Sequence, residues 1–235
     1  MRVRIKFTKY GCMKFIGHLD VMRYFQKALR RANFDVALST GFSPHMLMSF
    51  AAPLGVGVTS DAEYFDLDLV TNGSSAEMVE KLNAVMAEGI EVKSVGQIPE
   101  DKASKGMTLV AAADYEVRFR PGKIELPADY KEQMKAFLAQ DSVMMMKKTK
   151  KGQKEMDILP LIYSMEEEAG VFKLFVSQGS VNNLKPDMVM NAFLAFMGID
   201  VPPFTFMVHR KEIYAATGNP EQPYVSLESL GSEIL

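Results

Sequence analysis

Two histidines and an aspartate in the first fifty residues are the side chains best suited to chemistry, namely His18, Asp20 and His45. An imidazole can act as a general acid or base near neutral pH, and two imidazoles with a carboxylate can ligate a divalent metal. The three residues have no diagnostic metal-binding spacing, so we assign no metal site. We expect His18 and His45 to face one another across a cleft. The alternative for His18 is a structural histidine at a helix start.

His45 lies in the segment GFSPH, residues 41–45, whose other residues are explained by backbone geometry. Pro44 drives Ser43 toward an extended backbone, and Gly41 permits a turn. The segment therefore predicts the entry to a strand. Turn geometry makes no demand for an imidazole, so His45 stays a candidate site residue.

Four basic residues follow one face of the helix predicted for residues 18–32. They are Arg23, Lys27, Arg30 and Arg31. Their spacing of i, i+4, i+7 and i+8 places them opposite the apolar face of that helix. The default interpretation is a solvated helix face. The alternative is a surface that contacts the phosphates of a nucleic acid, whose binding would then depend steeply on salt.

A second basic group surrounds Gly152 between two predicted strands. Its members are Lys147, Lys148, Lys150, Lys151 and Lys154. As the tip of a hairpin, this group is a charged loop that resists edge-to-edge aggregation. As a flexible basic finger, it would clamp a polyanion or an acidic partner.

The order of predicted elements indicates an α+β protein with two lobes. Strands are predicted at 2–7, 46–54, 62–70 and 90–98, and helices at 18–32 and 74–89. This βαββαβ order in residues 1–98 recurs, with an extra strand or hairpin, in residues 107–215. We expect two ferredoxin-like lobes with antiparallel sheets, the second elaborated by the basic hairpin, and a loosely held tail at 216–235.

Charge is segregated along the chain. Residues 1–50 carry nine Lys and Arg against two acids, whereas residues 51–107 carry ten acids against four lysines. Such asymmetry indicates either a polyanion-binding face or two segments that pair with one another.

The expected fold favours internal pairing for the first strand. In a ferredoxin-like lobe this strand lies beside the third, so we expect Arg4 and Lys6 to lie near Asp66 and Asp68 and to form ion pairs. With the same alternation, Tyr64 is the main aromatic side chain on the exposed face of the sheet. That pattern argues against a sheet that binds RNA through exposed aromatic residues.

Composition narrows the class of protein. The chain has 235 residues, 48% of them hydrophobic, which suffices for one large core or two ordinary domains. Its single cysteine, Cys12, excludes an internal disulfide and an iron–sulfur cluster ligated by this chain alone. Neither a signal-peptide apolar region nor a run of roughly 18 apolar residues occurs. We therefore expect a cytoplasmic protein with no cofactor and no membrane contact.

Several motifs occur together in this chain. The first block contains Phe15, His18, Leu19 and Asp20, then ALRRA at 28–32, then GFSPH at 41–45. Further blocks are KKTKKGQKEMDILPLI, GSVNNLKPDMVMNAF and HRKEIY. Together they resemble the radical-SAM-linked protein family, also described as DUF2344, from about residue 3 to residue 215. Met46 stands where that family usually has a second proline.

The resemblance implies a bacterial accessory protein with no settled activity of its own. It implies a radical SAM enzyme as partner, which supplies the iron–sulfur cluster in trans, since this chain lacks a C-x-x-x-C-x-x-C run. The implied role is substrate recognition, with RNA (tRNA or rRNA) as the preferred class. On this hypothesis the basic face of helix 18–32 and the 147–154 hairpin bind RNA, while His18, Asp20 and His45 line the cleft.

Two alternatives stay open. The first is a metal-independent RNA endonuclease that uses His18 and His45 as acid and base. The second is a purely protein-binding module whose ligand is the radical SAM enzyme itself. A non-catalytic accessory protein is the interpretation we favour.

Overall fold

The structure is a computed structural model. It describes residues 1–71, 73–149, 152–180 and 182–235, without the side chains of residues 147–149. Across these residues the chain is a mixed α+β protein with five α-helices and one large, mostly antiparallel sheet. No helix within the described ranges has the length and apolarity needed to cross a membrane.

The N-terminal half alternates strands and helices in the expected order. Its elements are β1 (Arg2–Lys9), the short 3-10 helix η1 (Gly11–Phe15), α1 (His18–Arg31), β2 (Met48–Phe50), β3 (Thr59–Asp68), α2 (Ser75–Asn83) and β4 (Val92–Ile98). The strand order is β4-β1-β3-β2, with every neighbouring pair antiparallel. The predicted capping box begins α2, because Ser74 and Glu77 exchange hydrogen bonds between side chain and backbone.

The C-terminal half repeats this arrangement with an inserted hairpin. Its elements are α3 (Gly106–Leu109), β5 (Val110–Phe119), α4 (Tyr130–Leu138), β6 (Met144–Thr149), β7 (Gly152–Asp157), the short 3-10 helix η2 (Leu159–Leu161), β8 (Ile162–Glu168), β9 (Val171–Ser177), α5 (Pro186–Phe196) and β10 (Phe206–Ala216). The strand order is β10-β5-β9-β8, again antiparallel throughout. Strands β6 and β7 pair only with each other.

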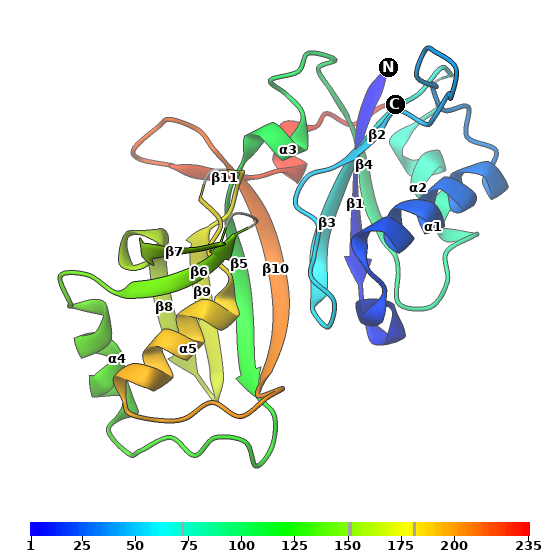
Figure 1. Ribbon diagram of the computed structural model, residues 1–235. Coiled ribbons are helices and arrows are strands. Elements are labelled where there is room, and N and C mark those ends of the chain that lie inside the picture. The colour runs from blue at the N-terminus through cyan, green and yellow to red at the C-terminus, as the bar shows by residue number, and fades with distance from the viewer. Residues whose placement is uncertain (72, 150–151, 181) are drawn as a thin grey trace.

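The two halves join through β3 and β10 into one continuous sheet. The two strands run parallel and pair only where Thr59 and Ser60 meet His209 and Arg210. Figure 1 shows them side by side at the centre of the molecule, with α1 and α2 packed on the N-terminal half and α4 and α5 on the C-terminal half.

Each half has its own core, and a third, smaller cluster lies between them. Phe7, Phe25 and Phe65 centre the N-terminal core, and Phe172 and Phe193 centre the C-terminal one. Members of the third cluster come from both halves; they include Ala51, Ala62, Tyr64, Val110, Ile213 and Leu227. Burial of this shared cluster ties the halves together.

The charged side chains of β1 form ion pairs inside the protein, and these pairs agree with the expectation only in part. Arg4 binds the carboxylate of Asp66 at 2.8 Å, and both side chains are buried. Asp68 pairs with Arg2 rather than with Lys6. The expectation for Lys6 is wrong, because its neighbour across β3 is Tyr64 and its ammonium lies between Glu212 and Glu228.

Tyr64 also differs from expectation. Only 1% of its surface is exposed, because the C-terminal half and the segment after β10 cover this face of β3. Its hydroxyl donates to Glu212 at 2.6 Å. A single lobe would leave this face of the sheet exposed to solvent. In the whole chain the face is an internal contact.

Residues 216–235 are anchored, which contradicts the expectation of a loosely held tail. They form β11 (Tyr224–Ser226), which pairs with β10, and the 3-10 helix η3 (Glu228–Leu230). Leu227 is fully buried, and its carbonyl accepts from Arg4. The chain then returns to the N-terminal half, where the N–H of Ile234 donates to the Ser75 hydroxyl at 2.9 Å.

Truncation of Leu227 should therefore destabilise the whole protein. Leu227→Ala removes a fully buried side chain from the cluster between the halves, and such changes cost about 2–5 kcal/mol. Urea unfolding followed by circular dichroism measures the loss. Leu235→Ala, at a fully exposed position, is the control and should stay within about 0.5 kcal/mol of the parent. Equal stability of the two variants would contradict an anchored tail.

Candidate functional site

A cavity of about 700 Å³ lies between the two halves. The N-terminal half contributes Phe15 and the loop 53–58, and the C-terminal half contributes residues of β5, β10, α5 and the loop before β10. This volume is within the usual range for ligand sites, which often form where two domains meet. We call this cavity the interlobe cleft.

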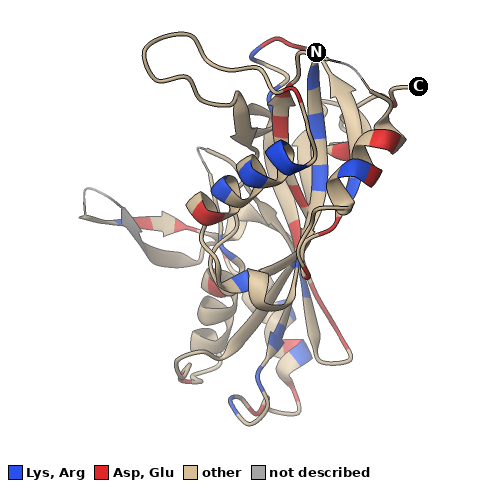
Figure 2. Cartoon of the chain, turned by 90° about the vertical axis from the view of Figure 1, so that its right-hand side faces the viewer, with Lys and Arg blue, Asp and Glu red and all other residues tan. Residues whose placement is uncertain are grey.

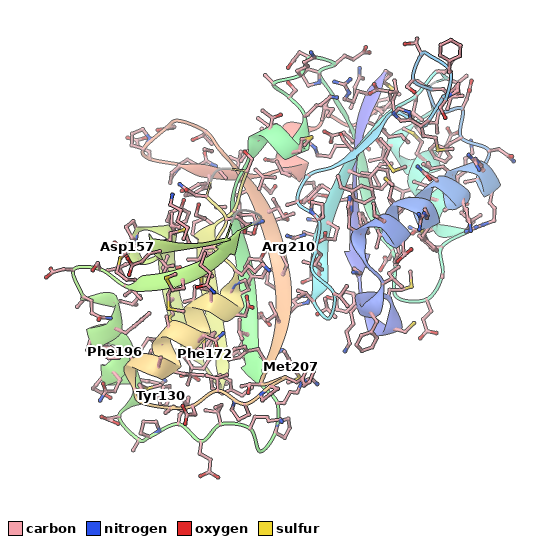
Figure 3. The ribbon with its side chains drawn as sticks, viewed as in Figure 1. Tyr130, Asp157, Phe172, Phe196, Met207 and Arg210 are labelled. Carbon is pink, nitrogen blue, oxygen red and sulfur yellow. The ribbon has the colours of Figure 1, made fainter. Side chains whose placement is uncertain are left out.

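The floor of the interlobe cleft is a buried polar network centred on Arg210. Its guanidinium binds Glu63 at 2.5 and 3.0 Å and donates to the carbonyl of Ala52 at 2.7 Å. It also donates to the Tyr115 oxygen at 3.4 Å, and the Tyr115 hydroxyl donates to Gln178 Oε1 at 2.9 Å. Figure 3 shows Arg210 on β10 between the halves.

Arg210 and Tyr115 of this network keep their protons. Burial alone would lower the pKa of Arg210, but the adjacent Glu63 carboxylate more than offsets this and raises it. Burial raises the pKa of Tyr115. Arg210 is therefore a cation and Tyr115 a neutral hydroxyl at any physiological pH, and their hydrogen bonds have fixed directions.

Aromatic rings from the two halves flank this floor. Phe15 of η1 is 65% exposed and Phe204, in the loop before β10, is 85% exposed. Both line the cleft, so it presents apolar faces above a polar base. Such a combination suits a flat ligand with hydrogen-bonding edges.

Four polar side chains that line the cleft have no partner in the part of the chain that the structure describes. Arg120, Lys185, Asp187 and Asn191 form no hydrogen bond or ion pair through their side chains with any described residue. Three of them lie in or next to the segment NNLKPDMVMN, which precedes and begins α5. Their hydrogen-bonding capacity is available to a ligand.

His18 lies beside this cleft. It lines an adjoining cavity of about 410 Å³ that shares Gln178, Asn183 and Pro53 with the interlobe cleft. The imidazole ring packs edge-on against Phe50, with ring centroids 5.1 Å apart. Burial lowers its pKa, although Glu63 opposes the shift.

His45 is not brought together with His18. It lies exposed in the loop before β2, where its Nδ1 is 2.8 Å from the Ser39 hydroxyl. It lines a separate cavity with Arg2, Asp66 and Asp68. Met48 and Ser49 border both cavities, so β2 separates the two histidines. The expected cleft shared by His18 and His45 is not formed.

Asp20 is exposed at the start of α1 and forms an ion pair with Arg23 at 3.4 Å. It lines none of the cavities described above. No group of three or more His, Cys, Asp or Glu within the described ranges is arranged to hold a metal ion.

The third histidine, His209, belongs to a cluster at the junction of β3 and β10. Its Nδ1 is 2.8 Å from the Thr59 hydroxyl, and its Nε2 is 3.2 Å from Asp61. Tyr10 and Lys211 bind the same carboxylate. Although partial burial acts in the opposite direction, these donors lower the pKa of Asp61 to about 2. The cluster reinforces the short contact between the two strands.

The predicted basic face of α1 is exposed to solvent. Figure 2 shows basic residues recurring along this helix. Arg23 faces Asp20, and Arg31 donates to the carbonyl of Val85 at 3.0 Å. Lys27 and Arg30 are exposed and have no ion pair or hydrogen bond with any residue that the structure describes. We call these four residues the α1 basic face.

The basic hairpin is described only in part. Lys154 is exposed on β7. Lys150 and Lys151 lie outside the described residues, and Lys147 and Lys148 are described only as backbone of β6. The expected nucleic-acid-binding role of this group therefore stays a prediction.

The cleft residues themselves were not predictable from the sequence. Arg210 lies in HRKEIY and Lys185 in NNLKPD, two motifs of the family resemblance, but nothing in their spacing connects them to Glu63 or Phe15. Arg210 is flanked by His209 and Lys211 in a charged stretch, so the sequence carried no signal that its side chain is buried.

Comparison with known proteins identifies a family but no activity. A family model described as "Uncharacterized protein conserved in bacteria (DUF2344)" matches residues 2–186. None of the curated proteins matches this chain. Among solved structures, a chain of "Crystal Structure of a Cbf5-Nop10-Gar1 Complex" is similar, with a TM-score of 0.47 and 12% sequence identity over 90% of this chain. The alignment covers 48% of that chain, so the protein spans about half its length.

His18 should make the stability of the protein fall at mildly acidic pH. Burial lowers its pKa in the folded state, whereas an imidazole in the unfolded chain titrates near about 6.5. The unfolded state therefore binds the proton first, and the free energy of unfolding decreases as the pH falls from about 6.5 through the folded pKa. Glu63 and Lys9 line the same small cavity as His18, and Glu63 opposes this loss.

Urea unfolding between pH 7.5 and pH 5 measures this dependence. His18→Asn should flatten it, and Phe42→Ala, which alters an exposed loop side chain without a titratable group, should leave it as in the parent. An unchanged pH dependence in His18→Asn would show that another group is responsible.

Proposed function

Because the chain belongs to the DUF2344 family of uncharacterised bacterial proteins, whose model matches residues 2–186, we propose that it is an RNA-binding accessory protein of a radical SAM enzyme. The partner supplies the iron–sulfur cluster, and this protein presents the RNA substrate in the cytoplasm. We further propose that residues 1–98 and 107–215 are two ferredoxin-like lobes, which the strand orders β4-β1-β3-β2 and β10-β5-β9-β8 support.

The observation that carries this proposal is the different use of the cations of β1 and α1. Arg2, Arg4 and Lys6 of β1 are bound to carboxylates within the protein. By contrast, Lys27 and Arg30 of α1 are exposed and bind no described residue. Unpaired cations at helical spacing can neutralise successive phosphates and release their counterions.

The position of the cleft supports the same function. α1 begins at His18, which lines the cavity adjoining the interlobe cleft. An RNA strand that followed the α1 basic face toward the N-terminus of α1 would reach the cavity that adjoins a cleft with exposed aromatic rings. Proteins that recognise single-stranded RNA combine these two features.

The endonuclease alternative loses its geometric basis. It requires His18 and His45 to act on one phosphate, and β2 separates the cavities that they line. The protein-binding alternative is compatible with the structure, since the loop before β2 exposes the entire side chain of Phe42.

Removal of the two unpaired cations should weaken RNA binding and its salt dependence. The variant Lys27→Gln/Arg30→Gln removes two phosphate contacts, so the slope of log K against log salt should become less steep by about 1.4 for single strands. Fluorescence anisotropy with single-stranded fragments of tRNA and rRNA sequence across a salt series measures the slope.

The matched control is Lys102→Gln/Lys135→Gln, which removes two exposed lysines outside α1. The control should keep the slope of the parent. If both variants changed the slope equally, the attraction would be a general charge effect, and the α1 basic face would not be the site.

The proposed partner can be tested through Phe42. A fully exposed phenyl ring at a loop tip is the type of side chain that a protein partner buries. Affinity purification from the natural host, followed by mass spectrometry, should retain an enzyme with a C-x-x-x-C-x-x-C motif, and Phe42→Ala should reduce its yield severalfold. Leu235→Ala, another fully exposed apolar residue, is the control. Retention of no such enzyme by the parent would refute the partnership.

A further inference from the structure

The hydrogen bonds beneath the interlobe cleft determine which atoms of Gln178 face a ligand. Arg210 can only donate, so the Tyr115 oxygen accepts from it and the Tyr115 proton goes to Gln178 Oε1. The carbonyl of Gln178 is thereby occupied. Among the described residues no buried polar side-chain atom lacks a partner, and the Gln178 amide nitrogen bonds to none of them, so it reaches the cavity surface. The cleft offers an oriented N–H donor.

This donor carries no net charge. The guanidinium that orients it is neutralised by Glu63, and the ion pair is buried. A neutral amide donor is suited to a carbonyl oxygen, and it gives less preference to a carboxylate than a free cation would. The chemistry of the floor therefore selects a neutral group with an acceptor oxygen.

The two aromatic rings add a shape requirement. Phe204 has φ +60°, in the left-handed region that non-glycine residues rarely adopt, and its side chain is 85% exposed. A strained backbone that holds a ring in solvent contributes nothing to the core, and such strain is concentrated at functional sites. Phe15 reaches the same cleft from the other half. Two exposed ring faces suit a planar ligand that stacks.

Charged groups around the cleft indicate further features of the ligand. Arg120 and Lys185 have no side-chain partner among the described residues, and Asp187 is the one carboxylate among the residues that line the cleft. The excess cation can accept a phosphate, while Asp187 can accept an N–H from the ligand. The combination of stacking faces, a donor, an acceptor and a cation corresponds to a nucleotide.

We propose that the interlobe cleft binds one unstacked nucleobase that carries a carbonyl group, namely uracil, cytosine or guanine, with Gln178 donating to that carbonyl. The inference deepens the proposed RNA-binding function and rests on it. Adenine is disfavoured because it has no carbonyl oxygen, and its acceptors are ring nitrogens. Phe15 and Phe204 stack on the base, and Tyr115 is a positioning residue that holds the Gln178 amide in its orientation.

The test compares three single-stranded RNA hexamers, oligo(U), oligo(C) and oligo(A), by fluorescence anisotropy at constant salt. Oligo(U) and oligo(C) should bind about fivefold more tightly than oligo(A), as expected for one hydrogen bond. Phe204→Ala should weaken binding of all three by roughly fivefold or more, since a stacking contact is lost. Leu235→Ala removes an exposed apolar side chain outside the cleft and should have no effect.

Two variants distinguish the positioning of the Gln178 amide from a contribution to stability alone. Tyr115→Phe frees the Gln178 amide to rotate, so it should abolish the preference for oligo(U) while binding of oligo(A) stays near that of the parent. Gln178→Glu replaces the donor by an acceptor and should also abolish the preference. Circular dichroism of each variant verifies its fold, and Gln178→Ala serves if either variant unfolds.

The outcomes separate this inference from the proposed function. Lys27→Gln/Arg30→Gln should weaken all three hexamers and keep the base preference. If the hexamers bind equally, or if the preference survives in both Gln178 variants, the base-binding inference is overturned while RNA binding stands. If no hexamer binds but a peptide or another ligand protects the cleft, both proposals are overturned.

Discussion

The buried ion pair between Arg210 and Glu63 is the constraint on which the functional half of this structure depends. It crosses from β10 to β3, where the halves share only two pairs of backbone positions, and it also ties Arg210 to the carbonyl of Ala52. Burial of two charges is costly, and loss of either partner leaves an uncompensated charge. The pair therefore requires the halves to keep one relative position. That position creates the interlobe cleft, and the same guanidinium orients Tyr115 and Gln178 at its floor.

The use of charge explains why a chain with almost balanced composition can attract a polyanion. The cations of β1 are paired with carboxylates of β3, β10 and η3, and two of these carboxylates, Asp66 and Asp68, belong to the acidic segment that follows the N-terminal region. The α1 basic face and the cations near the cleft are among the cations left exposed. Net charge is thus a poor guide here, because the field outside the protein depends on the cations that have no internal partner.

Local patterns predicted the elements, whereas contacts between the halves were not predictable. Alternation and capping located β1, α1 and α2, and the pairing of Arg4 with Asp66 followed from strand order. Tyr64, Lys6 and the tail were misjudged for one physical reason: each is covered or bound by a segment far along the chain. The cleft was missed for the same reason, since Arg210 and Glu63 are 147 positions apart. Periodicity reports which face of an element is buried, and it does not report what buries it.

The most direct test of the account is the site at which RNA touches the protein. Photocrosslinking of a 4-thiouridine-containing single-stranded RNA, followed by mass spectrometry of the linked peptides, measures this without any substitution. The account predicts crosslinks in the segment that contains η1 and α1 and in the segments that contain Phe204 and the start of α5. Crosslinks concentrated instead on the stacked rings of Tyr163 and Tyr224, outside the cleft, would contradict it.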